Sequence, residues 1–249
     1  MRCTRKGLLV VGVVAACAAA AAAAADNGSE RAIGERLAGI IGAGRSIVSS
    51  HQGLINDPEI GEKNLTGERI VAEAVELYEK RRGEPPVTEA MEASERRLVE
   101  AALAAMREIV DENEALIDMK GLGFKGFLPA TYTRLVNERF GEKVGSEARV
   151  KFTAPPELVR NRKARPDAWE QRVLASQLGT PGWPRGEPYT EAVEVEGRPA
   201  FRMLIPEYYS ASCLSCHGEP KGQTDVTGYP KEGGREGDLG GATSITLFR

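Results

Sequence analysis

The feature that most constrains this chain is the segment Ser212–Gly218, which reads SCLSCHG. Two thiols are separated by two residues, and the imidazole of His217 follows the second thiol directly. A Cys-x-x-Cys-His sequence is typical of covalent haem attachment, in which each thiol bonds to one vinyl group of the porphyrin and the histidine becomes an axial ligand of the iron. We therefore predict one haem c, bound through Cys213 and Cys216, with His217 as its proximal ligand.

The small number of cysteines supports this interpretation. The chain has four, and Cys3 and Cys17 lie within its first 25 residues, so the pair at 213 and 216 is all that remains for the body of the protein. In an oxidising compartment such a pair would also suit a disulfide. A redox-active Cys-x-x-Cys usually belongs to a βαβ pattern, and that order is missing here, which favours haem attachment.

Residues 1–25 have the composition of a secretory leader rather than of a folded domain. A short basic start is followed by an apolar, alanine-rich run. Cleavage within that run would give a mature chain beginning near Asp26, whereas Val14–Cys17 resembles a bacterial lipobox, which would leave Cys17 acylated. An uncleaved anchor is disfavoured because alanine drives membrane insertion poorly. We expect a protein of the periplasm or the extracytoplasmic face of the membrane, with a lipid on Cys17 as its only membrane contact.

Charge and aromatic content argue against nucleic acid as a partner. Three of the 33 basic residues lie in the leader, so 30 remain against 36 acidic residues, and the body of the protein is acidic. Aromatic residues make up only 6% of the chain, too few for an extended stacking surface. No stretch after the leader approaches the roughly twenty apolar residues of a membrane span.

The first half of the body is predicted to be helical. Apolar residues recur at steps of three and four over residues 33–55, which predicts one amphipathic helix. A second helix is expected over Thr66–Arg82. A third is expected to begin at Thr88, a good N-cap, and to extend to about Asp118.

The second half changes character, with glycines and prolines followed by alternating apolar and polar residues. Alternation on both sides of Glu196-Gly197 predicts a β-hairpin. We therefore predict an α+β fold in one domain over residues 26–249, with N-terminal helices over about 30–118 and a small antiparallel sheet in the half over about 120–249. The other elements expected there are a helix over Ala130–Phe140, a helix over Arg165–Leu178, and strands over Val150–Ala154 and Ala242–Phe248.

The second axial position of the iron has one histidine candidate. The chain contains only two histidines, and His51 lies three residues after Val48 and three before Leu54, on the apolar stripe of the first helix. A histidine buried there would need a partner, which an iron or a backbone carbonyl would supply. Met119, Met203 and an open or water-bound site are the alternatives. We predict His51 as the distal ligand.

Several motifs together resemble those of a known family. They are QGLIND (Gln52–Asp57), GFKGFLPA (Gly123–Ala130), KFTA followed by RNR (Lys151–Arg162), CLSCHGEP (Cys213–Pro220) and GYPKEGGREGDLGGATSI (Gly228–Ile245). The chain, over about residues 31–249, resembles the single-haem c-type domains with a PAS-like fold that occur alone or as extracytoplasmic sensor regions of histidine kinases and chemoreceptors. This resemblance implies a PAS-like fold, haem c on Cys213, Cys216 and His217, and a sensory or electron-transfer role. One departure is Asn161-Arg162, where family members commonly have Asn-Pro.

The predicted function is that of an extracytoplasmic monohaem cytochrome, transferring electrons or sensing redox state through a six-coordinate haem. The alternative is a haem-based sensor of a gas or another small ligand. No transmitter precedes the end at Arg249, so we expect a separate redox partner or signalling protein in either case. An enzyme such as a peroxidase is disfavoured, because no further histidine is available for acid–base chemistry. We also hypothesise that Lys151, Arg160 and Arg202 pair with the haem propionates.

Overall fold

The computed structural model describes the backbone of residues 9–249 and the side chains from residue 27 onward. Residues 1–8 of the predicted leader, and the side chain of Cys17 with its predicted lipid, lie outside the described residues. Helix α1 (Leu9–Ser50) continues without a break through the predicted junction between residues 25 and 26. Within the described part of the chain, no helix is both long and apolar enough to cross a membrane.

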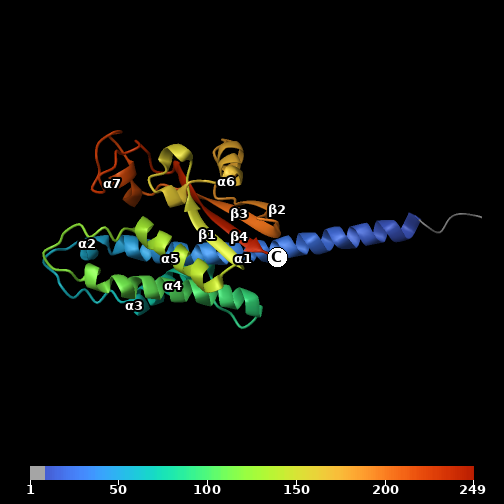
Figure 1. Ribbon diagram of the computed structural model, residues 1–249, viewed down its shortest axis with the longest axis horizontal. Helices are drawn as coiled ribbons and strands as arrows, with labels where there is room; N and C mark the ends of the chain where they lie inside the picture. Colours follow the sequence, from blue (N-terminus) through green and yellow to red (C-terminus); the bar gives the residue numbers. More distant parts are fainter. Residues whose placement is uncertain (1–8) are drawn as a thin grey trace, which may run out of the picture.

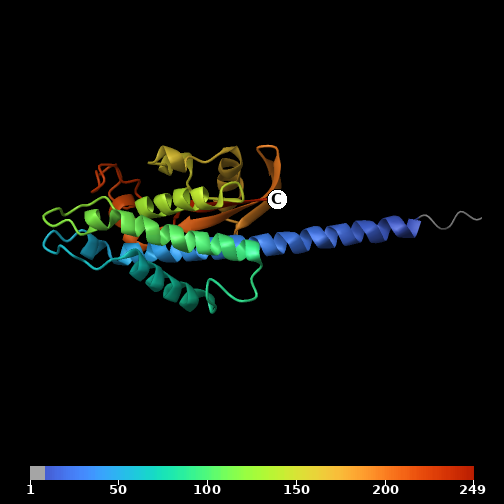
Figure 2. The ribbon, with the colours of Figure 1, turned by 60° about the horizontal axis from the view of Figure 1, so that its bottom comes forward.

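The helices of the first half form a bundle (Figures 1 and 2). Helix α1 packs against α3, α4 and α5, and is therefore the element that the others share. The single turn α2 follows it after His51, so the predicted first helix is interrupted at that residue. The bounds are Gln52–Ile55 for α2, Gly67–Arg82 for α3, Ala93–Ile117 for α4 and Pro129–Val144 for α5.

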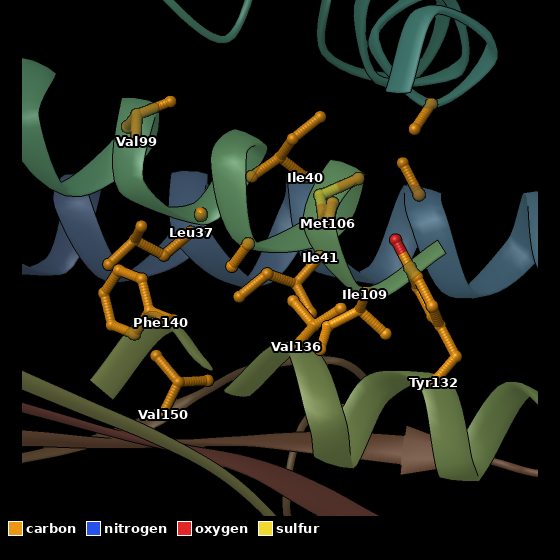
Figure 3. Packing of buried hydrophobic residues seen from close by; sticks show 14 of the residues in the cluster. Leu37, Ile40, Ile41, Val99, Met106, Ile109, Tyr132, Val136, Phe140 and Val150 are labelled. Carbon is orange, nitrogen blue, oxygen red and sulfur yellow. The ribbon is translucent and has the colours of Figure 1, made fainter. Parts of the chain in front are cut away.

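The main hydrophobic core lies where these helices meet the sheet. Leu37, Ile40 and Ile41 of α1 are buried together and point toward α4 and α5 (Figure 3). The helices contribute Val99, Met106, Ile109, Tyr132, Val136 and Phe140, and strand β1 contributes Val150. The steps of three and four found in the sequence are thus the spacing of the buried face of α1.

The strands of the described residues form one four-stranded antiparallel sheet in the order β1-β4-β3-β2. The hairpin between β2 and β3 turns at Glu196 and Gly197, both with positive φ (54° and 77°), which is the twist that a two-residue hairpin requires. The predicted order of helices followed by a small antiparallel sheet is confirmed. The bounds are Ala148–Thr153 for β1, Tyr189–Val195 for β2, Arg198–Tyr208 for β3 and Leu239–Phe248 for β4.

The segment between β1 and β2 covers the face of the sheet that α1 and α5 leave free (Figure 1). Helix α6 (Ala168–Val173) begins at Asp167, whose carboxylate accepts the backbone N–H of Glu170 in a capping box. Helix α6 and a π-helical turn (Leu174–Leu178) bury a second, smaller apolar cluster on the sheet. The predicted helix over 165–178 is therefore shorter at its start and changes to a wider turn at its end. Two 3-10 turns, Pro156–Leu158 and Arg162–Ala164, precede it.

The third predicted helix begins later than expected. Helix α4 starts at Ala93 rather than after Thr88, because the carbonyl of Thr88 is used by a turn to the backbone N–H of Met91 and by the guanidinium of Arg96. The second helix agrees with its prediction: the side chain of Thr66 accepts the backbone N–H of Arg69 and caps α3.

The start of α3 gives a test of this packing. A Cβ on Gly67 would lie 2.2 Å from the carbonyl oxygen of Arg107 on α4, so we expect Gly67→Ala to lower the free energy of unfolding. Overpacking of this kind costs about 1–3 kcal/mol. Gly42 lies within α1 with no atom near its missing Cβ, so Gly42→Ala is the matched control and should raise stability by about 0.5–1 kcal/mol. Urea unfolding measures both, and equal effects of the two substitutions would contradict the close approach of α3 to α4.

Candidate functional site

The Cys-x-x-Cys-His segment forms a short helical stretch directly after β3. A 3-10 turn (Ala211–Cys213) leads into α7 (Leu214–His217). Cys213 and Cys216 are both half-buried free thiols. Three positions apart in helical backbone, they lie on the same side of this stretch. The structure thus brings both predicted attachment thiols to one surface, next to the predicted proximal histidine.

The imidazole of His217 is held from two directions. Its Nδ1 lies 2.8 Å from Oε2 of Glu232, and its ring stacks on Tyr209 with 5.1 Å between ring centroids and 18° between ring planes. A carboxylate only accepts hydrogen bonds, so Nδ1 carries the proton of this bond. In the neutral imidazole the lone pair then lies on Nε2, which is the arrangement found in metal-binding histidines.

Arg160 holds the long loop between α7 and β4 against the cysteine segment. Its guanidinium lies 2.7 Å from Oε1 of Glu232 and 2.6 Å from Oδ2 of Asp225, and it donates to the carbonyl oxygen of Cys216 at 2.9 Å. Gly234 donates its backbone N–H to the carbonyl oxygen of His217 at 2.7 Å. The Glu232 carboxylate, which accepts a hydrogen bond from His217, is therefore held in place by a network of contacts.

Both acidic groups of this network stay ionised at neutral pH. Burial opposes the charge on Asp225, but hydrogen bonds from Thr227 and Arg160 outweigh it and lower the pKa of Asp225. Burial likewise opposes the charge on Glu232, and hydrogen bonds from Arg160 and His217 lower its pKa. The pKa of the Cys216 thiol is raised, mainly by burial, so this side chain is a neutral thiol at pH 7.

Tyr209 lies in a space that two glycines leave open. A Cβ on Gly234 would lie 2.6 Å from the Tyr209 ring, and one on Gly240 would lie 2.5 Å from it. Burial, followed by the negative charge of Glu232, raises the pKa of Tyr209 to about 12, so its hydroxyl is neutral at physiological pH. The flat phenol ring therefore supports the His217 imidazole without adding charge.

His51 is in a different environment from the one predicted. It lies between α1 and α2 with 18% of its side chain exposed, and its Nε2 is 2.7 Å from Oε2 of Glu73 on α3. Helix α3 packs on α1 and α4, on the side of α1 away from the sheet (Figures 1 and 2). The cysteine segment lies at the same end of the molecule but on the sheet side (Figure 1). The structure thus gives His51 a carboxylate partner, and its role as distal ligand stays a prediction.

The methionine alternatives also have defined positions. Met203 is fully buried in the main core, and its methyl group lies 2.3 Å from the position that a Cβ on Gly34 of α1 would take. Met119 is 48% exposed at the end of α4. Met203 is therefore committed to packing, and Met119 is a surface residue.

The three residues predicted to pair with the haem propionates lie in two different places. Arg160 lies beside the cysteine segment, as described above. Lys151 and Arg202 lie beneath α6, where both contact the buried carboxylate of Glu170, at 2.7 and 3.2 Å. Arg202 also stacks over Trp169. Lys151 and Arg202 are thus engaged by an internal charge cluster, and Arg160 alone is near the site.

Among the described side chains, no group of three or more His, Cys, Asp or Glu residues is arranged to hold a bare metal ion. A haem asks less of the protein, because the porphyrin supplies four of the iron ligands itself. The donor set of Cys213, Cys216 and His217 fits such a group: two accessible thiols on one surface, and an imidazole whose Nδ1 is already bonded and whose Nε2 is left for a metal.

A family model matches residues 81–247 of the chain, which is more than half of it; its description is Tll0287-like. The chain belongs to the Tll0287-like family. This is a family of c-type cytochrome-like domains. The match includes Cys213, Cys216 and His217, whereas His51 lies before it. Neither the search of curated proteins nor the search of solved structures returned a significant match.

Two residues at the site were not identified from the sequence as functional. Glu232 belongs to the GYPKEGG motif, which contributed to the family resemblance, but nothing in a glycine-rich loop indicates which acid faces His217. Tyr209 directly follows β3, and its role depends on the loop folding back over it.

The network around Arg160 predicts how the loop is stabilised. Arg160→Met removes the cation between two carboxylates, so residues 219–238 should open more readily. We expect amide hydrogen exchange of this loop to become at least tenfold faster, equivalent to about 1.4 kcal/mol. Arg172→Met is the control, because Arg172 pairs with Glu191 at an exposed position far along the chain from this loop. Unchanged protection of the loop in Arg160→Met would contradict the role of the guanidinium.

Proposed function

We propose that this chain is an extracytoplasmic monohaem c-type cytochrome, which transfers electrons or senses redox state. The observation that carries the proposal is the combination of two thiols on one helical surface with a histidine whose Nδ1 is bonded to Glu232. That bond presents Nε2 as a ligand of the correct tautomer. Membership of a c-type cytochrome-like family supports the same conclusion.

The thiols of Cys213 and Cys216 supply the covalent attachment. Each S–H would add across one vinyl C=C bond of the porphyrin, with a C–S bond formed and the thiol hydrogen placed on the other vinyl carbon. No external oxidant is needed, because the addition involves no net transfer of electrons. When bound, the haem supplies an iron that cycles between Fe(II) and Fe(III).

The ligand that would bind the iron on the side opposite His217 decides between two functions. Ligation by His51 would close the iron to other ligands and favour electron transfer, at a lower potential than a methionine ligand would give. The bond between His51 and Glu73 favours the second candidate, a sensor of a gas or another small ligand. Iron must compete with a carboxylate for Nε2 of His51, and a weakly held sixth ligand is readily displaced.

The remaining parts of the proposal rest on the sequence. The leader-like residues 1–25 and the haem c motif both favour the periplasm or the extracytoplasmic face of the membrane, with a lipid on Cys17 if the lipobox is used. The partner is a separate redox protein or signalling protein. A PAS-like fold is part of the same proposal.

Covalent haem is tested by producing the chain with the cytochrome c maturation machinery. We expect the wild-type band to keep peroxidase-stainable haem after denaturing electrophoresis. The Cys213→Ala/Cys216→Ala variant should lose all of it, because no thioether can form. Ser212→Ala and Ser215→Ala change the two flanking hydroxyls and should leave the staining intact. A colourless wild-type protein, or haem that is lost on denaturation, would refute the proposed function.

The distal ligand is tested by CO binding to the ferrous protein. If His51 binds the iron, His51→Ala should open that position and speed CO binding at least tenfold. Glu73→Ala removes the competing carboxylate and should slow CO binding instead. Rapid CO binding by the wild-type protein would support the sensor function. An unchanged spectrum and CO rate in His51→Ala would rule out His51 as the ligand.

A further inference from the structure

We infer that Glu232 and Arg160 set the reduction potential of the iron, with opposite signs, through the hydrogen bond to His217. This inference rests on the proposed function, since it requires a haem bound by His217. It concerns residues outside the Cys-x-x-Cys-His motif. It adds to the motif a chain of charges formed by Asp225 and Glu232 of the loop between α7 and β4 and by Arg160 of the segment between β1 and β2.

The chain of contacts is continuous and uses a different atom for each link. Asp225 Oδ2 lies 2.6 Å from Nη1 of Arg160, Arg160 Nε lies 2.7 Å from Oε1 of Glu232, and Glu232 Oε2 lies 2.8 Å from Nδ1 of His217. The two oxygens of Glu232 therefore face a cation on one side and the imidazole on the other. A change at either end of this carboxylate reaches the ring nitrogen directly.

The network is shielded from solvent. The exposed fraction of the side chain is 0% for Asp225, 16% for Glu232 and 17% for Arg160. Charges in such a position are screened less by water and salt than charges on the surface. An exposed carboxylate of the same loop therefore serves as the control. It shows how much one negative charge changes the reduction potential without a bond to His217.

The sign of each effect follows from the direction of the hydrogen bond. A carboxylate accepting from Nδ1–H pulls the proton toward itself and leaves more electron density on the imidazole, which makes Nε2 a stronger donor to iron. A stronger donor favours Fe(III) and lowers the potential. Arg160 draws electron density from the same carboxylate and raises the potential.

The experiment measures the potential of the covalently loaded protein by redox titration, normalised to the haem content of each variant. Glu232→Gln keeps the shape and an acceptor oxygen but removes the charge, so we expect the potential to rise. Arg160→Met removes the cation, so we expect the potential to fall: even when the loop opens tenfold more often, we expect the closed state, in which Glu232 bonds to His217, to remain the populated one. A tenfold change in the Fe(II)/Fe(III) ratio at fixed solution potential corresponds to about 59 mV, and we expect shifts of this order.

Two further variants separate tuning from structural damage. Arg160→Lys keeps the cation beside Glu232, so its potential should stay near that of the wild type. Glu236→Gln removes a negative charge from an exposed position of the same loop and should change the potential little. The ferric electron paramagnetic resonance spectrum should change in Glu232→Gln, because the donor strength of His217 changes, and stay as in the wild type in Glu236→Gln.

The outcomes are distinct. Shifts of opposite sign in Glu232→Gln and Arg160→Met support the inference. Shifts of the same sign would point to loosening of the loop and overturn it, as would equal effects of Glu232→Gln and Glu236→Gln. Failure of the proposed function is a separate result, because the variants and the wild type would then carry no covalent haem to titrate.

Discussion

The structure depends on the burial of one helix. Helix α1 contacts α3, α4 and α5 along the bundle, and it also contacts β3 and β4 of the sheet. Leu37, Ile40 and Ile41 fill the space between these elements. A single amphipathic helix thus joins the helical half of the chain to the sheet half, and the two halves share the main core.

This arrangement fixes the ends of the loop that carries the site. Strands β3 and β4 are neighbours in the middle of the sheet, so the segment between them must leave and return at nearly the same point. The backbone N–H of Tyr209 donates to the carbonyl oxygen of Asp238 at 2.9 Å, and that of Gly237 donates back to Tyr209 at 2.8 Å. The loop is closed at its base by the sheet and across its middle by Arg160, which brings Glu232 to a histidine fifteen positions earlier in sequence.

Local signals allowed much of this to be predicted, and the exceptions share a cause. The cysteine motif, the start of the second helix near Thr66 and the turn at Glu196 are properties of a few consecutive residues, and they were found from sequence. The periodicity around His51 gave the face of the helix on which it lies. It did not show that α3 packs beside His51 and supplies Glu73 as its partner. Glu232 was missed for the same reason, since it is defined by Arg160, 72 positions away.

The two sides of the proposed iron site differ in how firmly the protein determines them. On the proximal side, His217 is bonded to a carboxylate, stacked on a buried ring and followed by a loop held by a half-buried guanidinium. On the distal side, the predicted ligand is bonded to an acid on a helix that packs away from the sheet. A ligand-dependent switch requires this asymmetry: the proximal ligand is held tightly, and the distal ligand has a competing partner. Exchange of the one distal bond then changes the coordination of the iron. The same asymmetry suits an electron carrier only if His51 leaves Glu73 when the haem is bound.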